Sequence, residues 1–209
     1  MAILISTAGN IGAGKTTLAK WLGNNFNLEL NTEVVNDNRY LSDYYSDFNS
    51  YAFRLAIHFL SLRASQLLKA SASLNGSVID RSIYEDPEIF VRKFNDEKII
   101  EKRDYDTYFD LWNLIHPHLP KLDILIYLYC PVDVLLKRIK KRGRSYEQSI
   151  SVDFLNTLQN YYNEWINKFN LCKIIKVDSA NLSYTGGEEI EKLKTEITEY
   201  IRKYKSDHQ

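Results

Sequence analysis

Five short apolar runs divide the chain, and between them apolar residues recur at the spacing of about 3.6 positions that is typical of helices. The runs cover 3–7, 28–30, 77–79, 122–129 and 173–177. The run at 122–129 is almost wholly apolar, as a strand buried on both faces of a parallel sheet must be. This pattern predicts an α/β fold with a mostly parallel five-stranded sheet that helices cover on both faces.

Residues that favour helix ends bound the stretches between the runs. Ser50, Asp104 and Ser151 have side-chain oxygens that can accept hydrogen bonds from the unpaired amides of a first helical turn. We therefore expect helices over 15–23, from 50 to about 70, from 104 to before Pro117, from Pro131 onwards, from 151 to about 169, and over 188–205. Since no internal repeat or long linker separates them, these elements predict one domain over 1–209.

Charge and composition narrow the class of protein. The chain has 27 basic and 27 acidic residues, so its formal net charge is zero, which argues against a protein that coats nucleic acid or a membrane surface. Hydrophobic residues make up 44% and charged residues 26%, as in a globular chain that can bury a core. This composition excludes intrinsic disorder for most of the length.

No sequence feature marks a secreted or membrane protein. Two cysteines are too few for a disulfide framework, and no cluster of Cys and His has the spacing of a zinc site. No apolar stretch reaches the ~18 residues of a membrane-spanning helix, and the first residues lack the basic region of a signal peptide. We expect a cytoplasmic protein with reduced thiols.

A glycine-rich string follows the first expected strand and opens the first expected helix. Residues 9–16 read Gly-Asn-Ile-Gly-Ala-Gly-Lys-Thr and fit the P-loop pattern G-x-x-x-x-G-K-[ST]. Such a loop turns backbone amides inward around phosphates, its lysine reaches the β and γ phosphates, and its hydroxyl can ligate Mg²⁺. The predicted ATP-binding residues here are Gly9, Asn10, Ile11, Gly12, Ala13, Gly14, Lys15, Thr16 and Thr17.

A P-loop alone does not name the reaction, because small-molecule kinases, GTPases and motors share it. The chain leaves little room for a motor. The nearest string to the N-K-x-D motif by which GTPases read guanine lies at 167–170 and ends in Asn instead of Asp. A small-molecule kinase is therefore the leading class.

Three further segments carry distinctive strings. The first combines Glu33 with Asn-Asp-Asn at 36–38 and with the tyrosines that follow, the second is Asp-Arg-Ser-Ile-Tyr-Glu-Asp at 80–86, and the third is the basic run that leads into Gly-Arg-Ser-Tyr-Glu-Gln at 143–148. Together with the P-loop they resemble the deoxyribonucleoside kinase family, in particular its bacterial deoxyadenosine/deoxyguanosine kinases, over about 3–179. The resemblance implies a three-layer P-loop kinase fold with an arginine-rich lid.

The resemblance also implies the catalytic roles. Glu33 matches the general base that removes a proton from the 5′-hydroxyl of the nucleoside. Asp80 matches the acid that, with Thr16, organises Mg²⁺. Arg81 matches the arginine that holds Glu33 and approaches the transferring phosphoryl group, where positive charge is needed. Lys15 completes the expected catalytic set.

The basic run at 137–144 holds six basic residues in eight. By itself it could be a nucleic-acid patch. Gly143 and the Glu147 that follows favour the family's lid, at about 138–148, instead. The resemblance implies that Arg138, Arg142 and Arg144 close on the donor phosphates and that Glu147, with Tyr45, binds the sugar 3′-hydroxyl.

The nucleoside pocket is implied in the same way. Phe53, Ala56 and Arg63 share one face of the long helix that begins near 50. Ala56 stands where the family has a glutamine, whose amide pairs with the base. That departure leaves base specificity open. The implied acceptor-binding residues are Glu33, Leu41, Tyr44, Tyr45, Phe53, Ala56, Arg63, Arg81, Asp86, Phe90 and Glu147.

We therefore expect an enzyme that transfers the γ-phosphoryl group of ATP, with Mg²⁺, to the 5′-hydroxyl of a purine deoxyribonucleoside in nucleotide salvage. The donor base is expected between the lid and residues 178–184, and a homodimer is implied by resemblance only. Two alternatives stay open. One is a nucleoside monophosphate kinase of the thymidylate kinase type; the other is a nucleotide-binding subunit whose acceptor recognition is impaired by Ala56.

Overall fold

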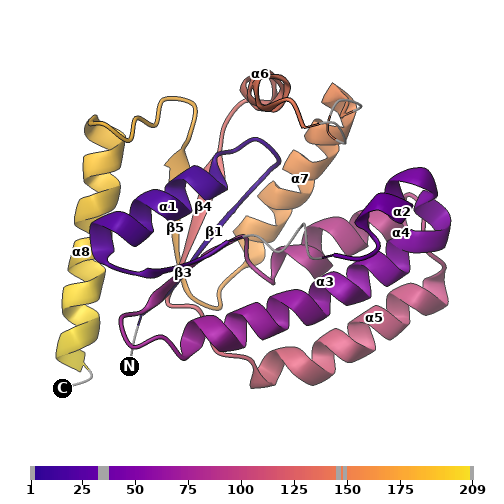
Figure 1. Cartoon of the computed structure of the whole chain (residues 1–209), viewed down its shortest axis with the longest axis horizontal. Coiled ribbons are helices and arrows are strands. Elements are labelled where there is room, and N and C mark those ends of the chain that lie inside the picture. Colours follow the sequence, from indigo (N-terminus) through magenta and orange to yellow (C-terminus); the bar gives the residue numbers. More distant parts are fainter. Residues whose placement is uncertain (1–2, 33–37, 145–146, 148–149, 208–209) are drawn as a thin grey trace.

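A five-stranded parallel sheet lies at the centre of the computed structural model, which describes residues 3–32, 38–144, 147 and 150–207 (Figure 1). The strand order is β2-β3-β1-β4-β5, and every neighbouring pair is parallel. This confirms the predicted α/β fold and all five strand positions, with ends shifted by a residue or two. The strands are β1 (Leu4–Gly9), β2 (Glu29–Asn31), β3 (Ser77–Asp80), β4 (Ile124–Tyr129) and β5 (Lys173–Asp178).

Helices cover both faces of this sheet (Figure 1). On one face lie α1 (Lys15–Phe26), α6 (Val132–Arg142) and α8 (Glu188–Asp207). On the other lie α3 (Phe48–Ser71), α4 (Arg92–Asp96), α5 (Lys102–Ile115) and α7 (Val152–Lys168), with the π-helix η2 (Asp86–Val91). Two short elements complete the described structure: α2 (Leu41–Ser46) and the 3₁₀ turn η3 (His116–His118).

The sheet separates two hydrophobic cores. Along β1, Leu4 and Ala8 belong to the core under α3, α5 and α7, whereas Ile5 belongs to the core under α1, α6 and α8. This alternation follows from the pleat of a strand, which sends successive side chains to opposite faces. A strand buried on both sides must be apolar at most positions, which is why β4 forms an unbroken apolar run, whereas β1 also buries Ser6, whose hydroxyl donates to the Ile79 carbonyl oxygen at 3.3 Å.

The predicted end of the first helix is wrong. Gly23 does not end α1, which continues to Phe26 and stops where Asn27 adopts a left-handed conformation with φ 53°. A Cβ on Gly23 would lie 3.3 Å from the carbonyl oxygen of Leu28 and 3.7 Å from Cβ of Leu30. Glycine at 23 therefore lets the helix pack closely on the β2 segment and is not a stop signal.

Two of the three predicted N-caps are also wrong. Asp47, not Ser50, caps α3, because its side chain accepts the hydrogen bond from the Ser50 amide. Helix α5 starts at Lys102, so Asp104 lies inside its first turn, where a carboxylate still interacts favourably with the helix dipole. Ser151 is confirmed as the cap of α7, since its hydroxyl accepts from the Phe154 amide at 3.1 Å.

Among the described residues, no helix is both long enough and apolar enough to cross a lipid bilayer. Both cysteines are free thiols; Cys130 is buried and Cys172 is partly buried.

The carboxyl ends of β1 and β3 point to the same edge of the sheet, because Thr7 is aligned with Asp80 in the parallel register. At this edge the chain turns from β1 into α1 and from β3 toward η2. In parallel α/β proteins, ligands bind at this edge.

Candidate active site

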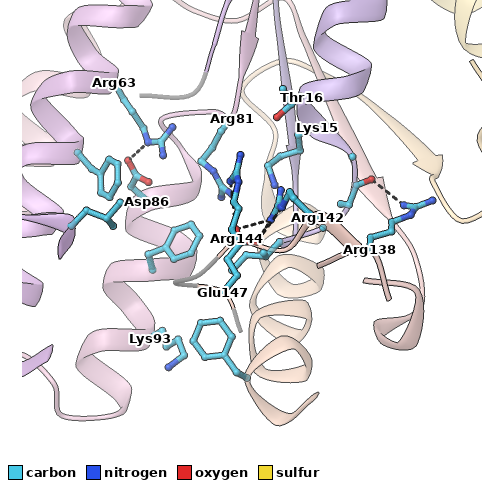
Figure 2. Close-up of a pocket in the computed structure, with 18 of the residues that line it drawn as sticks. Lys15, Thr16, Arg63, Arg81, Asp86, Lys93, Arg138, Arg142, Arg144 and Glu147 are labelled. Carbon is cyan, nitrogen blue, oxygen red and sulfur yellow. Dashed lines mark hydrogen bonds and ion pairs between the residues drawn. The ribbon is translucent and has the colours of Figure 1, made fainter. Parts of the chain in front are cut away.

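A cavity of about 590 Å³ opens at the carboxyl edge of the sheet, between the β1–α1 loop, α3 and the segment after α6 (Figure 2). Much of its wall had been expected from the sequence. The expected residues among its lining are Ile11, Gly12, Ala13, Gly14, Lys15, Thr16, Thr17, Leu41, Tyr44, Tyr45, Ala56, Arg63, Arg81, Asp86, Phe90, Arg138, Arg142, Arg144 and Glu147.

The β1–α1 loop has the backbone of a phosphate-binding turn. Gly12 and Gly14 have φ of 84° and 99°, values that side chains other than glycine rarely adopt. Lys15 folds back over the loop and donates hydrogen bonds to the carbonyl oxygens of Gly9 at 2.7 Å and Asn10 at 3.0 Å. The loop thus joins a buried lysine to the N-terminus of a twelve-residue helix, the combination that binds anions.

At the start of the same loop, Gly9 is packed against the neighbouring strand. A Cβ on Gly9 would lie 2.4 Å from the carbonyl oxygen of Leu128 in β4, its register partner. Asn10 fixes the next turn, because its side-chain amide donates to the Leu155 carbonyl oxygen at 3.0 Å and its side-chain oxygen accepts from the Ile11 amide at 2.8 Å.

Two oxygen ligands suited to a divalent cation lie side by side next to the loop. The Thr16 hydroxyl donates to Oδ2 of Asp80 at 2.5 Å, and Asp80 is buried at the end of β3. Mg²⁺ is usually bound by one or two protein oxygens together with phosphate and water oxygens. Thr16 and Asp80 fit this requirement, and no larger cluster of His, Cys, Asp and Glu with metal-site geometry occurs among the described residues.

Arg81 lies at the middle of the cavity wall, directly after β3. Its backbone is in the left-handed region, with φ 81°, which is unusual for a long side chain. The guanidinium lies over the ring of Phe90, 5.1 Å from its centroid, and Nη1 donates to the Tyr162 hydroxyl at 3.2 Å. Glu33, the expected general base and partner of Arg81, lies outside the described residues, so that contact stays a prediction.

A buried ion pair closes the far end of the cavity. Nε of Arg63 on α3 lies 2.8 Å from Oδ2 of Asp86 on η2, and both side chains are no more than 6% exposed. Ala56 lines the cavity from the same helix face as Arg63. Phe53 instead packs, half-buried, against the hydrophobic core on that side of the sheet.

Aromatic side chains form the adjoining wall. Tyr44 and Tyr45 come from α2, and Tyr44 packs on Phe94 with ring centroids 5.6 Å apart. Burial raises the pKa of Tyr44 well above its ordinary value, with smaller contributions from Tyr45 and Glu97, so its hydroxyl stays protonated. Tyr45 is partly exposed at the rim.

The arginines of the expected lid divide into two groups (Figure 2). Arg142, the last residue of α6, pairs with both carboxylate oxygens of Glu147 at 2.6 Å, and Arg144 lies 3.4 Å from the same carboxylate. Arg138 points elsewhere: it donates to the Ser179 carbonyl oxygen at 2.5 Å and to the Ala13 carbonyl oxygen at 3.4 Å. Arg138 therefore links the phosphate-binding loop to the loop after β5.

Several lining residues have no signal in the sequence. Lys93 on α4 is buried, forms an ion pair with Glu97 and lies with Nζ 4.8 Å from the centroid of the Phe154 ring on α7. Only packing in three dimensions brings these residues to one cavity. The others are Leu55, Phe59, Val91 and Phe94. Ser179, Leu182 and Tyr184 also line the cavity, but they lie within 178–184, the stretch expected from the sequence to hold the donor base.

The deoxynucleoside kinase family model matches residues 5–202 of the chain. This chain belongs to the deoxynucleoside kinase family. The match covers the phosphate-binding loop, Arg81, the Arg63–Asp86 pair and the lid arginines together.

Known deoxynucleoside kinases resemble the chain over most of their length. A deoxyadenosine/deoxycytidine kinase of Bacillus subtilis is 36% identical over 176 residues, which are 83% of this chain and 81% of that protein. A deoxyadenosine kinase of Lactobacillus acidophilus is 34% identical over 213 residues, 97% of this chain and 98% of that one. The structure of M. mycoides deoxyadenosine kinase with the products dCMP and a flexible dCDP superposes with a TM-score of 0.82 at 31% identity, covering 94% of this chain and all of that chain.

These comparisons confirm the family that the sequence motifs indicated, and with it a kinase that acts on deoxynucleosides in nucleotide salvage. The thymidylate kinase alternative is not supported, because the matching family is that of deoxynucleoside kinases. The alternative of a subunit without enzyme activity is not supported either.

Proposed function

We propose that this deoxynucleoside kinase transfers the γ-phosphoryl group of ATP to the 5′-hydroxyl of a deoxyribonucleoside and prefers a purine acceptor. One observation carries the proposal. A single cavity has the phosphate-binding loop with Lys15 at one end and the buried Arg63–Asp86 pair at the other, and Arg81 lies between them (Figure 2). A donor triphosphate and a nucleoside bound at these ends would meet near Arg81.

On the donor side, loop amides, Lys15 and the N-terminus of α1 would bind the phosphates. Arg138, Arg142 and Arg144 would add positive charge near these phosphates. The donor base would rest near Arg138, against Ser179, Leu182 and Tyr184. Burial raises the pKa of Tyr184 to about 12, so it offers this base a protonated hydroxyl.

Thr16 and Asp80 would hold Mg²⁺, which neutralises charge on the β and γ phosphates when bound. Glu33 would accept the proton of the 5′-hydroxyl while the 5′ oxygen forms its bond to the γ-phosphorus and the bond to the ADP oxygen breaks. Arg81 would stabilise the charge on the transferring group from the wall of the cavity.

Support for a purine comes from the base end of the cavity. Arg63 offers donors and Asp86 offers acceptors, so together they suit a base edge that carries both. Alanine at 56 leaves the adjoining wall short, which gives room to a two-ring base. Most of the similar proteins are described as deoxyadenosine or deoxyguanosine kinases, although one is described as a deoxyadenosine/deoxycytidine kinase and another as a probable deoxycytidine kinase.

Glu147 and Tyr45 would bind the sugar 3′-hydroxyl from the rim. Because Glu147 already accepts from Arg142 and Arg144, its carboxylate would be held by these arginines while it receives the hydroxyl.

The proposal treats residues 1–209 as one kinase domain that pairs with a second copy. Light scattering after size exclusion tests the pairing, and a mass near 24.5 kDa would contradict it.

The test of the proposed reaction is a screen of the four natural deoxynucleosides and their 5′-monophosphates with ATP and Mg²⁺. We expect 5′-monophosphate products and the highest kcat/KM for deoxyadenosine or deoxyguanosine. A higher kcat/KM for both pyrimidines would overturn the purine preference. Turnover of monophosphates without turnover of nucleosides would overturn the reaction itself.

A further inference from the structure

Behind Arg81, outside the cavity wall, lies a carboxylate that no step above has used. Glu85, in the turn between β3 and η2, is completely buried. Its Oε2 accepts from the Ser82 amide at 2.8 Å. Its Oε1 accepts from the Gly9 amide at 3.3 Å, from Nη1 of Arg81 at 3.3 Å and from the Tyr162 hydroxyl at 2.5 Å.

These contacts join three separate parts of the chain at one oxygen atom. Gly9 is the first residue of the phosphate-binding loop, Arg81 follows β3, and Tyr162 belongs to α7. Nη1 of Arg81 also donates to the Tyr162 hydroxyl, so Glu85, Arg81 and Tyr162 form a closed triangle of hydrogen bonds. Burial, and next the charge of Glu85, raises the pKa of Tyr162 well above its ordinary value, so this hydroxyl remains a donor.

The backbone of Arg81 makes such a support necessary. A left-handed conformation is unfavourable for arginine and persists only where its surroundings impose it. The Arg81 amide donates to the Thr7 carbonyl oxygen at 3.1 Å, which fixes the backbone. The guanidinium lies over the Phe90 ring, and its Nη1 donates to both Glu85 and Tyr162.

We propose that Glu85 is a positioning residue for phosphoryl transfer. It holds the guanidinium of Arg81 and the Gly9 end of the phosphate-binding loop in one fixed relation, so that the acceptor oxygen and the γ-phosphoryl group meet in line. A misplacement of about 1 Å can slow such a reaction about 10²-fold. The proposal rests on the role proposed above for Arg81.

The test compares Glu85→Gln with Asp123→Asn, each alone and in an Arg81→Lys background. Glutamine keeps the size of Glu85 but puts an amide group, which donates, where the carboxylate accepts from several donors. Asp123 is the matched control because its Oδ2 also accepts from a backbone amide, that of Leu4. Leu4 is the first residue of β1, whereas Arg81 follows the residue aligned with Thr7 near the other end of that strand. Melting temperature, kcat and the KM of deoxyadenosine and ATP are measured for each variant.

We expect Glu85→Gln to lower kcat by about 10- to 100-fold while both KM values change less than about 3-fold, because the residue acts on the transition state through Arg81. In the Arg81→Lys background, Glu85→Gln should lower kcat by less than about 2-fold further. Asp123→Asn should lower the melting temperature without a comparable loss of kcat. Losses that multiply in the double variant would overturn the proposal, since a merely structural role acts independently of Arg81.

Tyr162→Phe provides the second variant if Glu85→Gln does not fold. It removes one side of the triangle and keeps the Glu85–Arg81 contact, so we expect a loss of kcat of about 3- to 10-fold that disappears in the Arg81→Lys background. Full kcat in Glu85→Gln, or in Tyr162→Phe where Glu85→Gln does not fold, would overturn this inference and leave the proposed function standing, because the wild-type enzyme is active in the same assay. A wild-type protein that turns over no nucleoside would instead overturn the proposed function.

Discussion

Replacing Ala56 with glutamine is the most direct test of the base end of the cavity. Ala56 is 5% exposed and lines the cavity two helical turns before Arg63. Glutamine would add a side-chain amide with one acceptor and two donor hydrogens next to the Arg63–Asp86 pair. If water fills the space between Ala56 and the bound base in the wild-type enzyme, the glutamine amide replaces that water and pairs with the edge of the base.

The size of the effect follows from the number of new hydrogen bonds. Each contributes about 0.5–1.5 kcal/mol net, so two bonds to a matching base contribute about 1–3 kcal/mol. This corresponds to a gain in kcat/KM of about 5- to 150-fold for one purine deoxynucleoside. A base with the wrong edge leaves buried groups unpaired and gains nothing. Glutamine in a helix interior costs less than about 0.7 kcal/mol relative to alanine, so the melting temperature should fall by no more than about 3 °C.

The assay measures kcat/KM for all four natural deoxynucleosides with wild type, Ala56→Gln and Ser61→Gln. Ser61 is an exposed position of the same helix, so it receives the same side chain away from the cavity and should leave the profile unchanged. An unchanged profile in Ala56→Gln as well would refute the assignment of this wall to the base. A uniform loss on every acceptor would refute the reasoning that an amide fits there.

The other predictions concern the phosphoryl-transfer and sugar ends. Glu33→Gln should lower kcat by about 10²- to 10⁴-fold with little change in nucleoside KM, and a variant that keeps a third of wild-type kcat when chemistry limits the rate contradicts the role of Glu33 as base. Lys15→Ala should abolish most turnover and leave the melting temperature nearly unchanged, because Lys15 bonds the loop and not the apolar core; a collapse of the fold in circular dichroism contradicts this. Tyr45→Phe should weaken acceptors with a 3′-hydroxyl by about 1–3 kcal/mol and leave 2′,3′-dideoxynucleosides nearly unaffected. Glu147→Ala should do the same and also raise the KM of ATP, since it releases Arg142; equal losses on both acceptor types show that neither residue reads the 3′ position.

The sheet could be predicted from the sequence because its interior strands are mostly apolar, β4 throughout, and because short apolar runs also mark the edge strands β2 and β5 despite their charged residues. Helix ends were predicted less well. Ser50 and Asp47 are both good caps, and only the backbone path decides that Asp47 lies just outside the helix. Glycine often marks the end of a helix, but at position 23 its lack of a side chain instead allows the close approach of the β2 segment. Helices α2, α4 and η2 are too short for a periodic pattern.

Within the site, the predictable residues are those in contiguous motifs. The phosphate-binding loop and the Asp80–Asp86 string can be recognised because local spacing alone carries their chemistry. Lys93 and Phe154 lie far apart in the chain, and only the packing of α4 against α7 brings them to one cavity. Glu85 belongs to the Asp80–Asp86 string, but the sequence does not indicate its contact with Gly9, because the two residues are 76 positions apart in the chain.

The tight packing of Gly9 bears on which sequence changes this enzyme can tolerate. Any side chain at position 9 would meet the Leu128 carbonyl oxygen and force β1 away from β4 in the middle of the sheet. At Gly14 a Cβ would meet only the Tyr184 hydroxyl, at 4.0 Å, although its φ of 99° still disfavours a side chain. A protein altered at position 14 can therefore remain folded and inactive, and later changes can restore its activity. At position 9 the same change strains the β1–β4 pairing as well as the loop, so we expect stability and nucleotide binding to fall together and a return of activity to need a second change that also relieves the strand contact.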